Sequence, residues 1–470
     1  MRADLLPRPR HRILYLLYAP LQAVLRLVQV IWTLLFRIPY ADVLLIQTPP
    51  AIPTLAAAWL VHVVRGSAIV VDWHNLGFSV LQFGGRGAKH PLVWIARAYE
   101  RFFSRLAYQG FPLSRGLPAH LCVTQAMSAW LAREWGVRAS VLHDRPPEFF
   151  RALNADERHS LYRRLEKQLV RDARGERLWS AGEDPWGAGC TPWTVVGDDG
   201  HARIREHAPR ILVSSTSWSA DEDFGMMLEA LTQLDEELDK QVVDHTPTSA
   251  APTSAAPTAA APTAAAPTAA APRRLRVLAI VTGKGPLRKH YEARMREMPL
   301  RHVAVLTMWL EPEDYPALLG SSDLGVCLHT STAGIDLPMK VLDMFGCGLP
   351  VCARGFACLP ELLEDRANGR VFDSSHQLAA QLLELLAPTP EAAHALQTLR
   401  DGVAASEAQQ PRWAQNWQRA AAPLVLGTLQ SRERVVSTST QRLVWALVAI
   451  GCMGVAVSVC GISQYGPYTL

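Results

Sequence analysis

The fold is decided by residues 334–351, GIDLPMKVLDMFGCGLPV. This stretch follows SDLGVCLH (322–329), an apolar run typical of a strand that is buried on both faces of a parallel sheet. It predicts in turn a loop, a short helix and the start of the next strand. Parallel sheets with helices between their strands bind ligands at the carboxyl ends of the strands. We therefore expect Asp336, Lys340 and Asp343 to face such a crevice.

A second loop with the same placement is TGKGP, residues 282–286. It follows LRVLAIVT (275–282), a run rich in β-branched residues, and we expect the two loops to end adjacent strands. Gly283 and Gly285 allow a tight turn and the close approach of a ligand to the backbone. Lys284 and the N–H groups of the following helix would form an anion site. The alternative is a solvated turn with an incidental lysine.

Together the two loops meet the needs of a nucleotide-sugar. Its diphosphate needs cations and N–H donors, which Lys284 and Lys340 can supply. Its ribose and sugar hydroxyls need carboxylate acceptors, which Asp336 and Asp343 can supply. The alternative is that Asp336 caps the helix and Asp343 is only a first-turn acid. The candidate donor-binding residues are Ser215, Thr216, Gly283, Lys284, Gly285, Asp336, Lys340 and Asp343.

The strand RILVSST (210–216) is followed by an acidic run, DED (221–223). Ser219 and Glu222 have the spacing of a capping box, and acids in a first helical turn are stabilised by the helix dipole. The same run resembles the DxD metal motif of a different transferase fold. The capping interpretation is preferred, and no metal or other cofactor is expected.

The composition fits two or three domains with large cores. The chain has 470 residues, of which 49% are hydrophobic, and a net charge of +4 that does not argue for nucleic acid as a partner. The eight cysteines form no C-x-x-C pair, and Cys327 and Cys352 fall in predicted buried strands. We therefore expect neither a disulfide framework nor a zinc site. Strand and helix alternate throughout, which predicts an α/β fold with doubly wound parallel sheets.

The first half of the chain carries a candidate catalytic group. SAIVVDWHNLG (67–77) predicts a buried strand that runs into a loop. Asp72 and His74 lie at its carboxyl end, where either could remove a proton from an acceptor hydroxyl. Asn75 is a candidate acceptor contact beside them. The alternative is that these side chains only satisfy loop N–H groups.

Two apolar segments suggest a membrane. The helix expected at 20–37 has a wide apolar face, which fits either an in-plane membrane helix or a core helix of the domain. Residues 443–462 are uncharged over a length that spans a bilayer, and basic residues precede them, so this tail is a candidate anchor with the bulk of the chain in the cytosol. The polar stripe of the first helix consists of Gln22, Arg26, Gln29, Thr33 and Arg37.

The organisation of the chain follows from these segments. Residues 246–272 repeat Ala, Pro and Thr without core-forming residues and predict a disordered insert, partly polyproline II. The predicted parts are an acceptor-side domain at 1–150, a charged connector at 151–209, a donor domain at 210–410 with an insert at 244–273, a cross-over helix at 411–430 and a tail at 431–470.

Seven stretches occur in an order and at spacings that resemble one family: DWHNLGFSVL (72–81), HPLVWIARAYERFF (90–103), LCVTQAM (121–127), ILVSSTSWSADEDF (211–224), VTGKGPLRKHY (281–291), the run at 309–353 and PRWAQNW (411–417). They resemble the chitobiosyldiphosphodolichol β-mannosyltransferase family. The resemblance implies a GT-B fold, in which two Rossmann-like domains face a cleft. It also implies an inverting transfer of mannose from GDP-mannose to dolichyl-diphosphate-linked di-N-acetylglucosamine, with a β-1,4 bond, on the cytosolic face of the endoplasmic reticulum. Other mannosyltransferases of lipid-linked oligosaccharides are candidate partners.

The sequence departs from the family pattern at its start. Family members normally begin with a hydrophobic anchor and a first strand with a Gly-Arg-Ser-Pro loop, so the opening strand of the first domain is expected to be missing. Two further functions stay open. One is a non-catalytic scaffold of the same fold for lipid-linked-oligosaccharide transferases, and the other is a GT-B enzyme that uses a UDP-sugar.

Overall fold

The structure, a computed structural model, describes residues 24–25, 27–82, 87–109, 120–169, 171–178, 189–219, 222–244, 275–331 and 333–432. The Ala-Pro-Thr insert, Arg26 and the expected spanning segment at 443–462 lie outside the described residues. Among the described residues, no helix combines the length and the apolar character needed to cross a bilayer.

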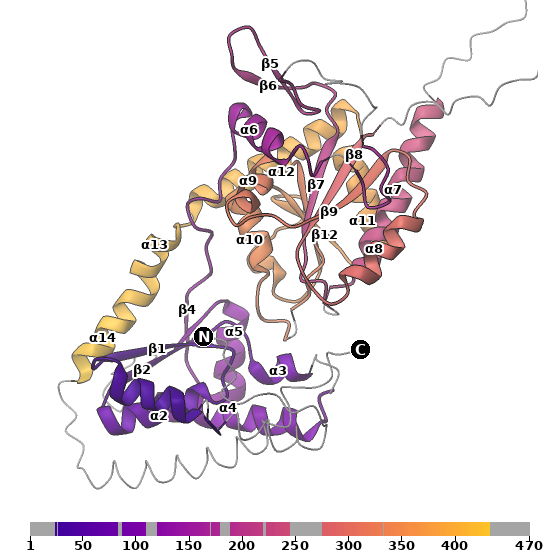
Figure 1. Cartoon of the computed structure of the whole chain (residues 1–470). Helices are drawn as coiled ribbons and strands as arrows, with labels where there is room; N and C mark the ends of the chain where they lie inside the picture. The colour runs from indigo at the N-terminus through magenta and orange to yellow at the C-terminus, as the bar shows by residue number, and fades with distance from the viewer. Residues whose placement is uncertain are drawn as a thin grey trace, which may run out of the picture.

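The N-terminal domain is built on a parallel sheet with the strand order β1-β2-β3-β4. Strand β2 lies in the run expected to form a strand at 67–77 and is buried along its whole length. Helices pack against this sheet (Figure 1). The elements are β1 (Val43–Thr48), α2 (Thr54–Arg65), β2 (Ala68–Trp73), α3 (Gly77–Leu81), α4 (Pro91–Gln109), β3 (His120–Cys122), α5 (Gln125–Trp130), the π-helical turn η3 (Leu131–Trp135) and β4 (Ser140–Val141).

The C-terminal domain has a second parallel sheet, with the order β12-β11-β10-β7-β8-β9. Its strands and helices follow the alternation expected from the sequence. The strands are β7 (Arg210–Ser215), β8 (Val277–Thr282), β9 (Val303–Met308), β10 (Leu324–Cys327), β11 (Val351–Arg354) and β12 (Gly369–Phe372). The helices between and after them are α7 (Phe224–Asp244), α8 (Arg288–Glu297), α9 (Asp314–Ser321), α10 (Met339–Gly346), η4 (Leu359–Glu361), α11 (Ser375–Leu386) and α12 (Pro390–Gln409).

This strand order corrects one prediction. The TGKGP loop follows β8 and the GIDLP loop follows β10, so they were expected on adjacent strands. Strand β7 pairs with both β8 and β10 and therefore lies between them. The two loops still share one edge of the sheet, because all these strands are parallel. The end of β7, at Ser215 and Thr216, becomes the middle of the donor side.

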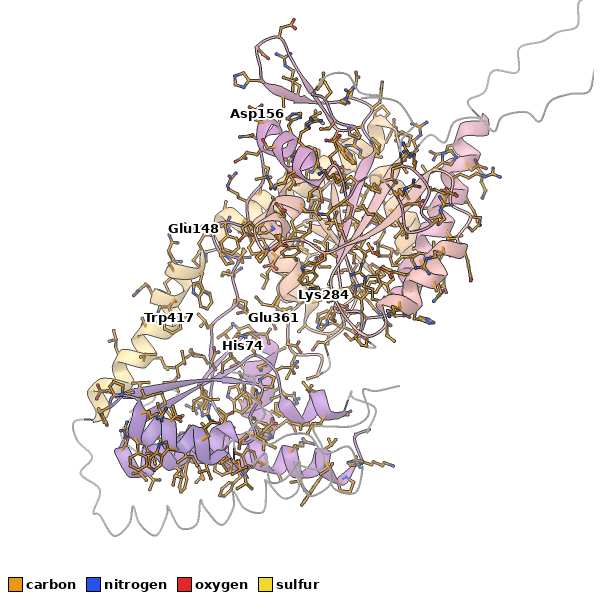
Figure 2. All side chains as sticks on the ribbon, in the orientation of Figure 1. His74, Glu148, Asp156, Lys284, Glu361 and Trp417 are labelled. Atoms are coloured by element: carbon orange, nitrogen blue, oxygen red, sulfur yellow. The ribbon has the colours of Figure 1, made fainter. Side chains whose placement is uncertain are left out.

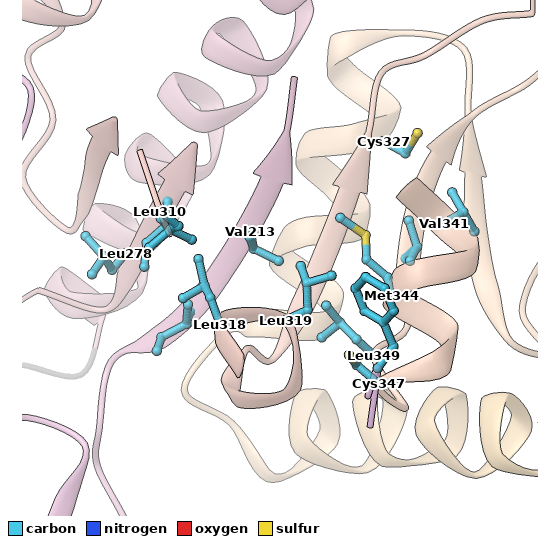
Figure 3. Close-up of a cluster of buried hydrophobic side chains, with 14 of the residues drawn as sticks. Val213, Leu278, Leu310, Leu318, Leu319, Cys327, Val341, Met344, Cys347 and Leu349 are labelled. Carbon is cyan, nitrogen blue, oxygen red and sulfur yellow. The ribbon is translucent and has the colours of Figure 1, made fainter. Parts of the chain in front are cut away.

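Apolar layers fill both faces of the second sheet. Val213, Leu278 and Met344 belong to the layer shown in Figure 3, where side chains from the strands meet those of α9 and α10. Burying a side chain of this size stabilises a fold by about 1.5–3 kcal/mol. Cys327 and Cys352 are fully buried, and the described cysteines are free thiols, as expected for small core residues.

The connector expected at 151–209 belongs to the C-terminal domain. It contains α6 (Ala155–Leu165), which begins with a capping box between Asn154 and Glu157, and a hairpin of β5 (Thr194–Val196) and β6 (Ala202–Ile204). Leu161 and Trp193 are buried in the core of that domain. The described part of the segment is therefore a folded extension of the C-terminal domain.

A final helix returns to the first domain, as the sequence predicted (Figure 1). It runs as α13 (Trp413–Asn416), the π-helical turn η5 (Trp417–Ala421) and α14 (Ala422–Arg432). Leu424 packs with Val70 of β2, and the Asn416 amide donates to the His143 carbonyl at 2.6 Å. The two domains are thereby tied at one end.

The described part of the helix expected at 20–37 lies on the surface. It ends in the π-helical turn η1 (Thr33–Arg37). Leu27 is buried against the first domain, whereas Val28, Trp32 and Phe36 are more than half exposed. A core helix would bury most of its apolar side chains, so the described part of this helix is not a core helix. The interfacial placement stays a prediction.

Candidate active site

The carboxyl ends of both sheets meet between the domains. Thr124 follows β3 of the first sheet, and Ile335 lies in the loop after β10 of the second. The Thr124 hydroxyl donates to the Ile335 carbonyl at 2.5 Å, and the Ile335 side chain packs into the core of the N-terminal domain. The loop after β10, which carries the candidate Asp336, therefore contacts the N-terminal domain at the end of β3.

On the acceptor side, His74 lies between two carboxylates. Its Nε2 is 2.9 Å from Oδ2 of Asp72, and its Nδ1 is 3.8 Å from Oδ2 of Asp144. Asp72 and His74 come from the end of β2, and Asp144 comes from the chain after β4. Sequence analysis missed Asp144, because it followed a two-residue strand that no apolar run marked. Its position three residues after a strand was the available signal.

The charges of this cluster depend on one another. Burial by itself lowers the pKa of His74, but the hydrogen bond that its ring donates to Asp72 and the charges of Asp72 and Asp144 outweigh it, so the pKa is raised from 6.5. Burial raises the pKa of Asp144. Asp72 Oδ1 is buried and accepts no hydrogen bond from the described part of the chain. The group can therefore accept a proton from a hydroxyl placed beside it.

The loop that carries His74 is held from two sides. The amide oxygen of Asn75 accepts the N–H of Leu76 at 2.7 Å, so this atom fixes the turn. Glu100 of α4 is fully buried and accepts hydrogen bonds from the backbone of Phe78 and Gly77. Burial raises the pKa of Glu100 to about 8, despite these two bonds. A largely protonated carboxyl thus supports the start of α3.

On the donor side, the TGKGP loop lies directly on the chain after β7. A Cβ at Gly283 would lie 1.8 Å from the carbonyl oxygen of Thr216, and one at Gly285 would lie 1.7 Å from that of Ser217. Gly283 also has a φ of +137°. Both glycines are therefore required for this close approach, as the sequence indicated. Lys284 Nζ lies 3.6 Å from the centre of the Trp309 ring.

Glu222 corrects the capping prediction. Helix α7 begins at Phe224, and the Glu222 carboxylate accepts the N–H of Ser217 at 2.8 Å instead of reaching the N–H of Ser219. It also accepts from the Thr216 hydroxyl and pairs with Lys340 Nζ. The side chain of Glu222 is 2% exposed and that of Lys340 is 25% exposed. Asp221 lies outside the described residues.

The acids of the GIDLP segment occupy different surroundings. Asp336 is nearly buried, accepts from the Ser331 hydroxyl and lies 4.0 Å from His329 Nε2. It does not cap α10, whose N-cap is Pro338. Burial raises the pKa of Asp343 to about 6. Both side chains are therefore held within the donor side.

Ser215 and Asp343 share a neighbour. The Ser215 hydroxyl donates to Tyr315 Oη at 3.1 Å. Burial raises the pKa of Tyr315, and the charge of Asp343 adds to this effect, which places Asp343 near the same ring. The end of β7 thus lies between Lys284, which follows β8, and the acids Asp336 and Asp343, which follow β10.

The sequence was then compared with known proteins. Residues 263–388 match the family described as "Glycosyl transferases group 1". A human protein named "Chitobiosyldiphosphodolichol beta-mannosyltransferase" is 39% identical over 409 residues, which cover 87% of this chain and 77% of the relative. A protein of the same name from Dictyostelium discoideum is 33% identical, with 78% and 68% covered. The protein "UDP-glycosyltransferase TURAN" from Arabidopsis thaliana is 39% identical, with 88% and 83% covered.

Solved structures support the fold. The crystal structure of Anabaena HepE in complex with UDP has a TM-score of 0.50 and 14% identity, and it covers 87% of this chain and 82% of its own. This likeness concerns the architecture of two facing Rossmann-like domains. With relatives of this identity and coverage, and with the motifs placed as described, the chain belongs to the chitobiosyldiphosphodolichol β-mannosyltransferase family, whose fold is GT-B.

Proposed function

We propose that this chain is an inverting mannosyltransferase that moves mannose from GDP-mannose to dolichyl-diphosphate-linked di-N-acetylglucosamine and forms a β-1,4 bond. The observation that carries the proposal is the family membership over most of the chain, together with a charged group at the strand ends of each domain. The product would enter N-glycan precursor assembly.

The donor side would hold the nucleotide diphosphate. Lys340 and Lys284 supply positive charge, and the backbone N–H groups near Gly283 lie in the same loop. Asp336 and Asp343 would accept hydrogen bonds from the ribose and the mannose. Two lysines and these N–H groups can neutralise the leaving diphosphate, so we propose a reaction without a metal ion.

The acceptor side would supply the base. The 4-hydroxyl oxygen of the acceptor attacks C1 of mannose from the face opposite the diphosphate, and the bond from C1 to the phosphate oxygen breaks. The hydroxyl proton passes to the group formed by Asp72 and His74, which Asp144 supports. One displacement of this kind inverts the configuration at C1.

The acceptor would be reached from a membrane. Its dolichyl chain stays in the bilayer, so the N-terminal domain must lie close to the headgroups. The exposed Trp32 and Phe36 give this domain an apolar surface for such contact. We propose that the chain works on the cytosolic face of the endoplasmic reticulum, next to other transferases of lipid-linked oligosaccharides.

A UDP-sugar is the second candidate donor, because a relative of equal identity is named a UDP-glycosyltransferase. Competition by nucleotides separates the two candidates. We expect GDP to displace a labelled GDP-sugar at least about tenfold better than UDP, since a site that bonds one base leaves polar groups unpaired with the other. The measurement is fluorescence polarisation in EDTA, repeated with added magnesium. Equal displacement by UDP would favour the second donor, and binding that needs magnesium would contradict the metal-free proposal.

A further inference from the structure

Glu361 joins the two domains at the start of a helix. It ends the short turn η4 in the C-terminal domain, and its two carboxylate oxygens accept the N–H groups of Gln125 and Ala126, both at 2.7 Å. These are the first two residues of α5 in the N-terminal domain. Figure 2 shows Glu361 at the end of the C-terminal domain that faces the N-terminal domain, on the side of His74.

The helix has a cap of its own. Thr124 is the N-cap of α5 and accepts the N–H of Met127 at 2.9 Å. The first N–H groups of a helix have no partner within the helix. The carboxylate of Glu361, from the other domain, accepts the two that Thr124 leaves unbonded at Gln125 and Ala126. Gln125 is exposed, so water can replace Glu361 if the domains separate. The contact is therefore suited to form and break without unfolding α5.

A second contact couples this junction to the donor loop. The Thr124 hydroxyl that caps α5 also donates to the carbonyl of Ile335. The N–H of Ile335 donates to the Ser331 hydroxyl at 3.1 Å, and that hydroxyl binds Asp336. A chain of hydrogen bonds thus runs from the N-terminal domain to a carboxylate of the donor side.

The junction also lies at the centre of the acceptor side. Thr124 follows β3, which pairs with β2 on one side and with β4 on the other. Strand β2 carries Asp72 and His74, and Asp144 follows β4. Fixing the end of β3 against the donor domain therefore fixes both carboxylates of the base relative to the donor.

We propose that Glu361 and Thr124 form a latch that holds the two domains in the reactive arrangement, with Glu361 as a positioning residue for the transfer. This inference rests on the proposed function for its kinetic consequence. The latch itself is a property of the fold and can be tested without turnover.

The test compares Glu361→Ala and Glu361→Gln with a matched control, Glu364→Ala, which removes an exposed carboxylate three residues away. We expect kcat to fall by about ten- to hundredfold in Glu361→Ala, because a small misplacement of reacting groups has such an effect. Glu361→Gln keeps one acceptor oxygen and should lie between the alanine variant and wild type. Affinity for GDP and the melting temperature should stay unchanged, since the Glu361 carboxylate bonds the start of α5 and not the TGKGP or GIDLP loops.

A second readout follows the domains themselves. Spin labels on exposed positions of α4 and α12 report the distance between the domains by pulsed electron paramagnetic resonance. The latch predicts a wider distance distribution in Glu361→Ala than in Glu364→Ala, even if the wild type transfers no mannose. An unchanged distribution would overturn the latch. A loss of GDP affinity equal to the loss of kcat would also overturn it, because Glu361 would then act through the donor site.

Discussion

Replacing Lys340 by alanine is expected to weaken GDP binding by about ten- to hundredfold. A hydrogen bond to a charged group contributes about 1.5–3 kcal/mol, and Lys340 is the partly exposed cation at the start of α10. Isothermal titration calorimetry measures the affinity directly. Lys167→Ala, which removes an exposed lysine of the C-terminal domain away from this edge, is the matched control and should bind like wild type.

The Lys340→Ala variant also changes the surroundings of Glu222, and this effect must be distinguished from the loss of a contact to the diphosphate. Without Lys340, the buried carboxylate of Glu222 loses its cation, and an unpaired buried charge destabilises a site. The double variant Lys340→Ala with Glu222→Gln removes that charge. If Lys340 binds the diphosphate, the double variant binds GDP as weakly as the single variant. Restored affinity in the double variant, or unchanged affinity in the single one, would contradict the assignment.

Replacing His74 by alanine is expected to lower turnover by about 10²- to 10⁴-fold with GDP affinity unchanged, because a positioned base contributes that much to a rate. Asp72→Asn should lower turnover as well, since it removes the negative charge beside the imidazole and weakens the hydrogen bond that orients it. Turnover is measured with saturating donor and acceptor, beside calorimetry with GDP. Wild-type turnover in both variants would show that the base lies elsewhere.

The pH dependence follows from the same cluster. A base acts in its unprotonated form, and the pKa of His74 is raised above 6.5 by Asp72 and Asp144, against the effect of burial. The rate should therefore rise with pH through a value above 6.5. Asp144→Asn removes one of the two negative charges and should move this rise to lower pH, with the length of the side chain retained. The measurement is the pH profile of kcat/KM between pH 5 and 9 for wild type and Asp144→Asn.

Local patterns predicted the elements well. The runs at 275–282 and 322–329 became β8 and β10, and 334–351 became a loop, α10 and the start of β11. Continuous apolar runs between glycine and proline stops carry this information within a few residues. The order of the strands depends on packing between distant segments, so the place of β7 between β8 and β10 could not be read locally.

Only part of the site could be predicted from the sequence, because the site also depends on packing between distant segments. The positions of Lys284 and His74 at strand ends followed from the pattern of the chain. Glu222 had the spacing of a cap, but Lys340, far along the sequence, gives its carboxylate a stronger partner. Asp144 and Glu361 became visible only when β4 and the second domain were in place.

Transfer of mannose itself tests the central claim most directly. The full chain in detergent or liposomes is given GDP-mannose and a dolichyl- or phytanyl-diphosphate-linked di-N-acetylglucosamine, and the glycan is released and examined by NMR. We expect a trisaccharide with one mannose in a β-1,4 bond, and no product when UDP-glucose replaces GDP-mannose. An α-linked product, or transfer from UDP-glucose alone, would contradict the account. The absence of transfer from every sugar nucleotide, in a protein that still binds GDP, would instead support a scaffold of the same fold.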